Sequence, residues 1–162
     1  PVPLDRISSS EFVIRSVDGV KLSKILKPLG DLVGIPGQKD TFLIRLVAPA
    51  SNPRVGWNQL RTVIGSHGQV LPVFLGEHEQ PKYSVGTLQV RFPSPPSDDE
   101  LYAWLPAGLR VKARNEYIPS QISLEPAEPT GQFLPDLIAD LRQHNGDQVQ
   151  VWPETLQLFR KT

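Results

Sequence analysis

The residues best suited to catalysis or metal binding form two short acidic clusters. The segment 77–79 reads Glu-His-Glu, and imidazole and carboxylate groups are common metal ligands. Adjacent loop residues seldom form a site without a distant third ligand, so we interpret this segment as a solvated hairpin tip. The segment 98–100 reads Asp-Asp-Glu and has groups for acid catalysis or Mg²⁺ binding, but Ser97 before it completes a helix capping box. We therefore predict no metal site and no cofactor.

Covalent catalysis has little support in this chain. The sequence contains no Cys and no G-x-S-x-G motif, and its three histidines, His67, His78 and His144, fall in separate helix ends or loops. The glycine-rich loops that bind phosphates, G-x-x-x-x-G-K-[ST] and G-x-G-x-x-G, are missing too. We expect a protein that is not an enzyme.

Composition narrows the class of protein further. The 17 basic residues balance 17 acidic ones, so no overall field draws the chain to nucleic acid or to an anionic membrane. No apolar run approaches the roughly 20 residues of a membrane span. The chain begins at Pro1 and contains no Met, from which we expect a processed protein or a piece of a longer one. No residue pattern specifies a compartment, and a cytoplasmic location is favoured.

The elements that must position any functional residue lie between residues 40 and 117. The strand 42–47 is apolar on both faces, which is typical of a central strand. Asn52 and Pro53 are suited to begin a helix, and Gly68 is the better placed of two glycines to end it. One apolar face of this helix is formed by Trp57, Leu60 and Ile64.

The second half of this region repeats the alternation of strand and helix. The strand 70–75 contains Pro72, which cannot donate to a strand ladder and predicts a sheet edge. The strand 86–92 alternates strictly, with Leu88, Val90 and Phe92 toward a core. A helix then begins at the capping box, and the strand 109–114 points its basic residues outward.

The segments on either side of this region are predicted to contain a mixture of strands and helices. Asp-Gly at 18–19 separates the apolar segments 11–17 and 20–26, which predicts a β-hairpin. A short helix over 22–29 is the competing interpretation. After residue 118 we predict a short strand, a third amphipathic helix marked by Leu134 to Leu141 and ended by Asn145-Gly146, and two short strands around residues 152–153.

The order strand-helix-strand-strand-helix-strand predicts an α+β protein with a ferredoxin-like, or split βαβ, core. Right-handed crossovers would place both helices on one face of the sheet. We expect three parts: an N-terminal extension with the hairpin at 1–38, the ferredoxin-like core at 39–118, and a C-terminal helix and strand extension at 119–162 that packs on the core.

This arrangement resembles two families built on the same fold. In the third strand, Gly86 and the Val-Arg-Phe segment 90–92 fit the frame of RNA-recognition domains, although the stacking aromatics of that family are replaced by Thr87 and Gln89. The strand 42–47 and the helix after it are similar to ACT-type regulatory domains, which implies small-ligand sensing. These resemblances cover about half the chain.

One constellation of candidate binding residues emerges from the predicted core. In the split βαβ arrangement the first and third strands are central and the fourth lies beside the first. The side chains that point away from the helices are then Arg45, Thr87, Gln89, Arg91, Arg110, Lys112 and Arg114. Five of these are basic and none is acidic, which suits phosphates. Acidic residues of the C-terminal part, such as Glu125 and Asp136, could instead supply counter-charges and cover the face.

These observations favour a non-catalytic protein-interaction module. We expect a domain or accessory subunit of a larger protein or complex that docks through a sheet face or an edge strand. One alternative is a nucleic-acid-binding module that uses the basic sheet face. Another is an ACT-like regulatory domain that senses a small-molecule effector.

Overall fold

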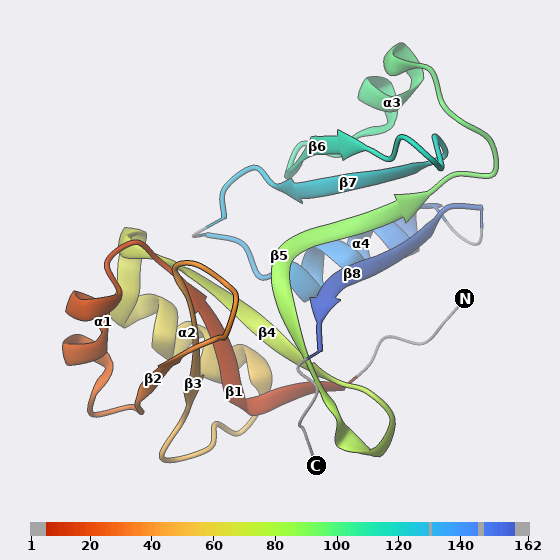
Figure 1. Ribbon diagram of the computed structural model, residues 1–162. Coiled ribbons are helices and arrows are strands. Elements are labelled where there is room, and N and C mark those ends of the chain that lie inside the picture. Colours follow the sequence, from red (N-terminus) through yellow and green to blue (C-terminus); the bar gives the residue numbers. More distant parts are fainter. Residues whose placement is uncertain (1–5, 130, 146–147, 158–162) are drawn as a thin grey trace. The chain divides into compact units, whose positions relative to one another are not determined.

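The structure is a computed structural model that describes residues 6–129, 131–145 and 148–157. It is a mixed α+β protein, and within these residues eight strands pair into an antiparallel sheet accompanied by four α-helices (Figure 1). The chain divides into two compact units. The N-terminal unit comprises residues 6–84 and 155–157, and the C-terminal unit comprises residues 85–154.

The N-terminal unit contains six elements and the start of a seventh. In chain order they are β1 (Arg6–Arg15), α1 (Gly19–Leu26), β2 (Leu32–Gly34), β3 (Thr41–Arg45), α2 (Pro53–Ile64), β4 (Gln69–Leu75) and the first residues of β5 (Pro81–Arg91). The strand order across the sheet is β2-β3-β1-β4. Short 3-10 turns at 65–67 and 77–79 follow α2 and β4.

Both helices of this unit lie on the same face of its sheet, because α1 contacts α2 and α2 packs on β1 and β4. The approach of α2 to β1 requires a glycine, since a Cβ atom at Gly56 would lie 2.6 Å from Cζ of Phe12. Trp57 anchors the helix by donating from Nε1 to the carbonyl of Val70 at 3.2 Å. The fully buried side chains of this core include Phe12, Ile14, Leu22, Leu26, Ile44, Leu60 and Phe74.

The caps of α2 confirm its predicted start and correct its predicted end. The Asn52 side chain accepts a hydrogen bond from the Val55 N–H at 3.0 Å, and Pro53 is the first helical residue. The helix ends at Gly65, which has φ of 59° and donates its N–H to Arg61. Gly68 is extended, with φ of −171°. The prediction that Gly68 ends the helix is therefore wrong.

The predicted N-terminal hairpin is also wrong, and the competing helix is present as α1. Leu22 and Leu26, four residues apart, are completely buried on one side of this helix. A hairpin would have required residues 20–26 to pair with β1. β1 instead has β3 on one side and β4 on the other, so neither of its edges is available.

The C-terminal unit contains the rest of β5, followed by α3 (Asp98–Trp104), β6 (Leu109–Arg114), β7 (Gln121–Pro126), α4 (Leu134–Asn145) and β8 (Gln150–Leu156). Its strand order is β6-β7-β5, and β8 also pairs with β5. The capping box is confirmed: Ser97 Oγ accepts from the Glu100 N–H at 3.1 Å, and Glu100 Oε1 accepts from the Ser97 N–H at 3.2 Å. The buried core includes Leu88, Val90, Ile122, Leu124, Leu134, Ile138 and Leu141.

The observed strand pairing differs from that of the predicted core in one fundamental respect. We predicted that strand 42–47 lies beside 86–92 and 109–114. That pairing is wrong, because β3 lies between β1 and β2 and β6 pairs with β7. The division between the two units falls at residues 84 and 85, inside the predicted range 39–118.

The position of Pro72 in the sheet also differs from the prediction. β4 is an interior strand with β1 and β5 as neighbours, not an edge strand. It tolerates a proline because β5 pairs with it only at residues 73–75, so the β5 ladder begins after Pro72.

Candidate functional site

The structure distributes the six predicted site residues over both units. Arg45 is the last residue of β3 in the N-terminal unit. Gln89 and Arg91 lie on β5, and Arg110, Lys112 and Arg114 lie on β6, in the C-terminal unit. Within that unit, β7 separates β5 from β6.

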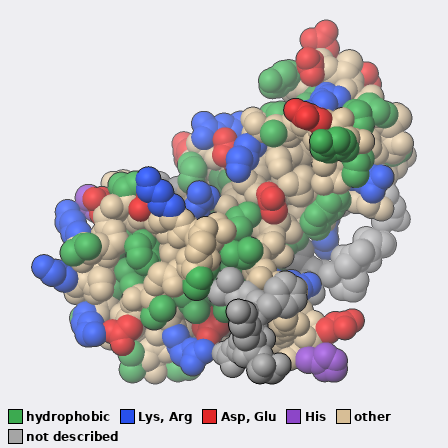
Figure 2. Space-filling view, in the orientation of Figure 1, with side chains coloured by type: hydrophobic (Ala, Val, Ile, Leu, Met, Phe, Trp, Pro, Cys, Tyr) green, Lys and Arg blue, Asp and Glu red, His purple; other side chains and the backbone are tan. Residues whose placement is uncertain are grey.

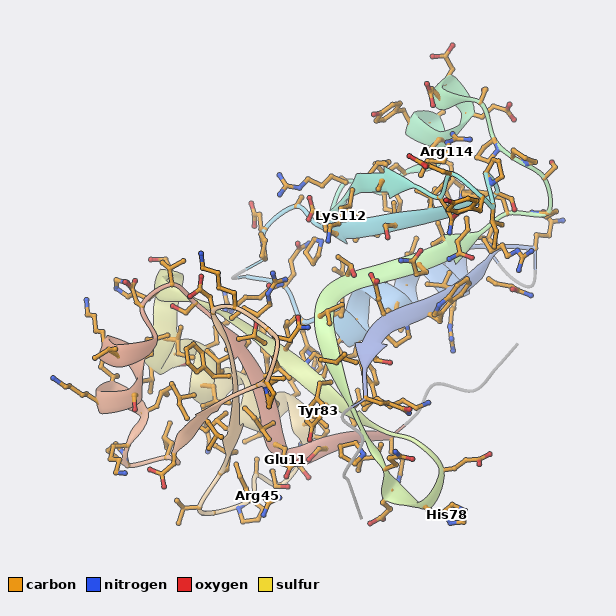
Figure 3. The ribbon with its side chains drawn as sticks, in the orientation of Figure 1. Glu11, Arg45, His78, Tyr83, Lys112 and Arg114 are labelled. Atoms are coloured by element: carbon orange, nitrogen blue, oxygen red, sulfur yellow. The ribbon has the colours of Figure 1, made fainter. Side chains whose placement is uncertain are left out.

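Arg45 is neutralised by a cross-strand carboxylate. Glu11 on β1 lies directly opposite Arg45, and Arg45 donates to Glu11 Oε1 from Nη2 at 2.5 Å and from Nε at 2.9 Å (Figure 3). The Glu11 side chain is only 14% exposed. Its hydrogen bond and charge raise the pKa of the Arg45 guanidinium above its ordinary value. This pair stabilises the sheet and leaves little free charge for an anionic ligand.

Two cations of β6 are also engaged within the chain. Arg110 Nε donates to Glu125 Oε1 of β7 at 2.8 Å, and the two residues are cross-strand partners. Arg114 lies beneath α3 (Figure 3), where it donates to the carbonyl of Pro96 at 2.8 Å and to Asp98 Oδ1 at 3.4 Å. Arg91 and Lys112 remain as exposed cations. Within the described residues, neither forms an ion pair.

The centre of the predicted basic face is a polar network that includes an acid. Glu154 on β8 accepts a short hydrogen bond from the Thr87 hydroxyl and another from Gln89 Nε2 at 3.2 Å. Gln89 also donates to Ser123 Oγ at 2.6 Å. Thr87, predicted to point outward, is 2% exposed. The prediction of a face without acidic residues is therefore wrong, since Glu125 and Glu154 both lie among the predicted cations.

A groove of the N-terminal unit lies elsewhere, between α1 and β2, and has a volume of about 1040 Å³. Its apolar floor and walls include Val20, Ile25, Leu32 and Phe42, and its charged lining consists of Asp18, Lys21, Lys24 and Asp40. Figure 2 shows Lys and Arg side chains around hydrophobic ones over α1, at the left edge of the molecule. Val17, Val20 and Val33 are 83%, 79% and 62% exposed.

Beside this groove, β2 presents a backbone edge that pairs with no other strand in the described part of the chain. β2 is the terminal strand of the sheet order and pairs with β3 on one side. Ile35 donates its N–H to the Thr41 carbonyl at 3.0 Å, so residues 33 and 35 direct their backbone groups toward β3. Strand alternation then directs the N–H and C=O groups of Leu32 and Gly34 outward. These are the groups to which another strand can add.

One indirect signal of this groove is present in the sequence. Lys21 and Lys24 are three residues apart, which is typical of one face of a helix, and such a charged face is ordinarily solvated. β2 itself has three residues, which is too short to show a period. Its position at the sheet edge depends on strand pairing that the sequence does not reveal.

In the two acidic clusters, Glu79 forms an ion pair with Arg6 and Glu100 caps α3. Among the described residues, no group of three or more His, Asp or Glu side chains could hold a metal ion. His67 Nδ1 lies 3.6 Å from Asp18 Oδ2, and His78 lies in the turn 77–79 with φ of 57°. The side chain of His144 lies outside the described residues. In the described part of the chain, no helix is long and apolar enough to cross a membrane.

Comparisons with known proteins identify no relative in sequence. No protein-family model matches the chain, and no curated protein matches it. Among solved structures, the C. elegans NONO-1 homodimer aligns with 94% of this chain at 15% identity and a TM-score of 0.29. This chain spans 65% of the length of that one. A likeness at this TM-score does not establish a shared fold.

Proposed function

We propose that the chain consists of two consecutive split βαβ, or ferredoxin-like, units. The first is β1-α1-β2-β3-α2-β4 and the second is β5-α3-β6-β7-α4-β8. In both strand orders, β2-β3-β1-β4 and β6-β7-β5 with β8 beside β5, the first and third strands are central and the fourth lies beside the first. This order supports the split βαβ assignment for each unit.

We propose that the protein is a non-catalytic interaction module that docks another protein chain at the edge of β2. The observation that carries this proposal is the outward backbone of Leu32 and Gly34 beside the apolar groove. An extended segment that pairs with an edge strand gains main-chain hydrogen bonds, and pockets beside the strand select its side chains. The exposed Val20 and Val33 would be removed from water in such a complex.

The groove offers space where an incoming chain needs it. Nothing lies within 4 Å of a Cβ atom built on Gly34, so a partner side chain can occupy this place without moving the N-terminal unit. A large part of the opposite face of the same sheet is buried, because Val13, Ile35, Leu71, Val73 and Tyr83 form a cluster there. The groove and edge therefore have better support as a docking site than this sheet face.

The proposal can be tested with a photo-crosslinking amino acid at position 33. We expect this probe to form covalent adducts with another polypeptide chain, and we expect Gly34→Trp to remove them by filling the groove. The matched control is the same probe at Val63, which is 39% exposed on α2, at the far side of the sheet order from β2. Equal adducts at both positions, or adducts at position 33 that persist in Gly34→Trp, would overturn the proposal.

The nucleic-acid alternative has less support after the counter-charges are counted. Of the predicted basic face, Arg91 and Lys112 are the exposed cations that form no ion pair with another described residue, and Glu154 lies within the same network as Gln89. Each protein cation that binds a phosphate releases counterions and adds affinity, so two exposed cations would provide only weak binding to nucleic acid. The small-ligand alternative has no specific observation in its favour.

A further inference from the structure

We infer that the chain docked at the β2 edge is a second copy of this chain, paired antiparallel about a two-fold axis at Val33. This inference rests on the proposed function, namely that the β2 edge binds protein. It adds the identity of the partner and the register of the pairing.

The backbone of β2 is complementary to itself. With the axis at Val33, Leu32 of each copy lies opposite Gly34 of the other. Both residues direct their N–H and C=O groups outward, so each pair can exchange two hydrogen bonds. A register displaced by one residue would place an outward-facing residue opposite an inward-facing one and lose these bonds. The backbone therefore permits the two-fold register at Val33 and disfavours registers displaced from it by one residue.

The side chains on the helix side of the strand also fit. Leu32 lies opposite Ile44 and Gly34 lies opposite Phe42 on β3, so Leu32 and Gly34 point to the face that carries α1. Gly34 has open space above it. In the dimer, the Leu32 side chain of one copy enters the space above Gly34 of the other. A large residue thus meets a small one at each of the two equivalent places.

On the other face of the strand, the axis brings two valines together. Val33 is 62% exposed, and the non-hydrogen-bonded pair at the axis holds opposing Cα atoms about 4.5 Å apart. Side chains at such a pair touch directly, and apolar or β-branched pairs stabilise a sheet. The exposure of Val33 in the single chain is thereby accounted for.

The charges that line the groove can pair with those of a second copy that lies in the reversed orientation. Asp18 and Asp40 lie at the end where Gly34 ends β2, and the N–H of Ser16 bonds the Asp40 carbonyl at 2.9 Å. Lys24 lies in the last turn of α1, near the short connection that leads into β2. Asp18 and Lys24 therefore lie toward opposite ends of α1, and a two-fold axis that reverses one copy brings Asp18 of each copy toward Lys24 of the other. Because the lining carries two acidic and two basic residues, a strongly charged foreign peptide would gain little electrostatic attraction from it.

The first test is sedimentation of the full chain over a range of concentrations from about 1 to about 200 μM, which covers weak and moderate association. We expect a reversible monomer–dimer equilibrium. Val33→Lys places two ammonium groups against each other at the axis and should weaken dimerisation by at least about tenfold. The matched control, Val63→Lys on α2, should leave it unchanged. A monomer at every concentration, or a Val33→Lys dimer of undiminished affinity, would overturn the inference.

A charge exchange tests the two-fold register directly. Lys24→Asp and Asp18→Lys should each weaken the dimer, because like charges then meet across the axis. The double variant restores opposite charges and should recover most of the affinity. Thermal melting of each variant verifies that it folds. If the double variant is weaker than both single variants, the proposed register is wrong.

The same experiments separate the two proposals. If the wild-type chain sediments as a monomer but the probe at position 33 still forms adducts with a different protein that Gly34→Trp removes, then the self-pairing fails and the docking function stands. If neither association occurs, both fail.

Discussion

At the scale of single residues, hydrogen bonding explains the place of Glu100, one of the acidic groups that first suggested chemistry. It accepts from the Ser97 N–H at the start of α3, where an ionised carboxylate also suits the helix dipole. Hydrogen bonding with Ser97, through its side chain first and its backbone second, lowers the pKa of the Glu100 carboxyl below its ordinary value. The group is a helix cap that works in its charged form.

This shift gives a pH prediction for Glu100→Gln, which keeps the shape of the side chain and removes the charge. Because the folded-state pKa is lowered, the contribution of Glu100 to stability is present above its unfolded pKa of about 4.3 and is lost as pH falls through the folded value. We expect wild type to melt at a higher temperature than Glu100→Gln at pH 7, and the two melting curves to converge at lower pH. A difference that stays constant from pH 7 to pH 2.5 would contradict this account.

Residues also show how far the site could be read from the sequence. The exposure of Arg91 and Lys112 was predicted correctly from strand alternation. Glu125 is among the acidic residues expected as possible counter-charges, but its pairing with Arg110 does not follow from the sequence, because the two are 15 residues apart. Glu11, which is 34 residues from Arg45, is not predicted as a partner at all. Such pairs depend on strand register, and alternation along one strand carries no information about which strand lies beside it.

At the scale of elements, local signals succeeded where the physical cause is local. The capping box and the Asn-Pro start of α2 involve residues within one helical turn, and both helices begin where predicted. The Asp-Gly signal at 18–19 failed because its outcome depends on neighbours distant in sequence. β1 is paired on both sides, and the following segment buries Leu22 and Leu26 as a helix instead.

The packing of α2 on β1 yields a prediction that runs against helix propensity. Alanine at a helix position ordinarily stabilises by about 0.5–1 kcal/mol relative to glycine. At Gly56, however, the new Cβ would lie 2.6 Å from the Phe12 ring, so helix or ring must shift. We expect Gly56→Ala to destabilise the protein by about 1–3 kcal/mol in chemical denaturation.

A matched control for this prediction is Gly34→Ala. Its Cβ has nothing within 4 Å in the single chain and its φ is not in the left-handed region. At concentrations where the protein is monomeric, we therefore expect a change within about 0.5 kcal/mol or a slight gain. If Gly56→Ala is as stable as wild type, the contact between α2 and β1 is looser than the structure shows.

At the scale of the whole molecule, the error in the predicted core has a definite origin. Two consecutive units of strand-helix-strand-strand-helix-strand produce a chain in which the same order also begins at the third strand. The range 39–118 follows this displaced frame, from β3 through β6, and every element in it exists. The pairing of β3 with β1 and β2 shows where each unit begins. A local sequence pattern does not reveal this pairing, because the paired strands are separate segments of the chain.

The division into two units leads to a final prediction about cooperativity. Each unit has its own buried core, with Leu60 of α2 completely buried in the first and Ile138 of α4 completely buried in the second. Leu60→Ala and Ile138→Ala should each create a cavity and cost about 2–5 kcal/mol locally. In amide hydrogen exchange, we expect Leu60→Ala to accelerate exchange mainly in residues 6–75 and Ile138→Ala mainly in residues 85–154. Each variant serves as the control for the other, because both remove the same kind of contact. Equal acceleration in both ranges by either substitution would show that the two cores unfold as one cooperative unit.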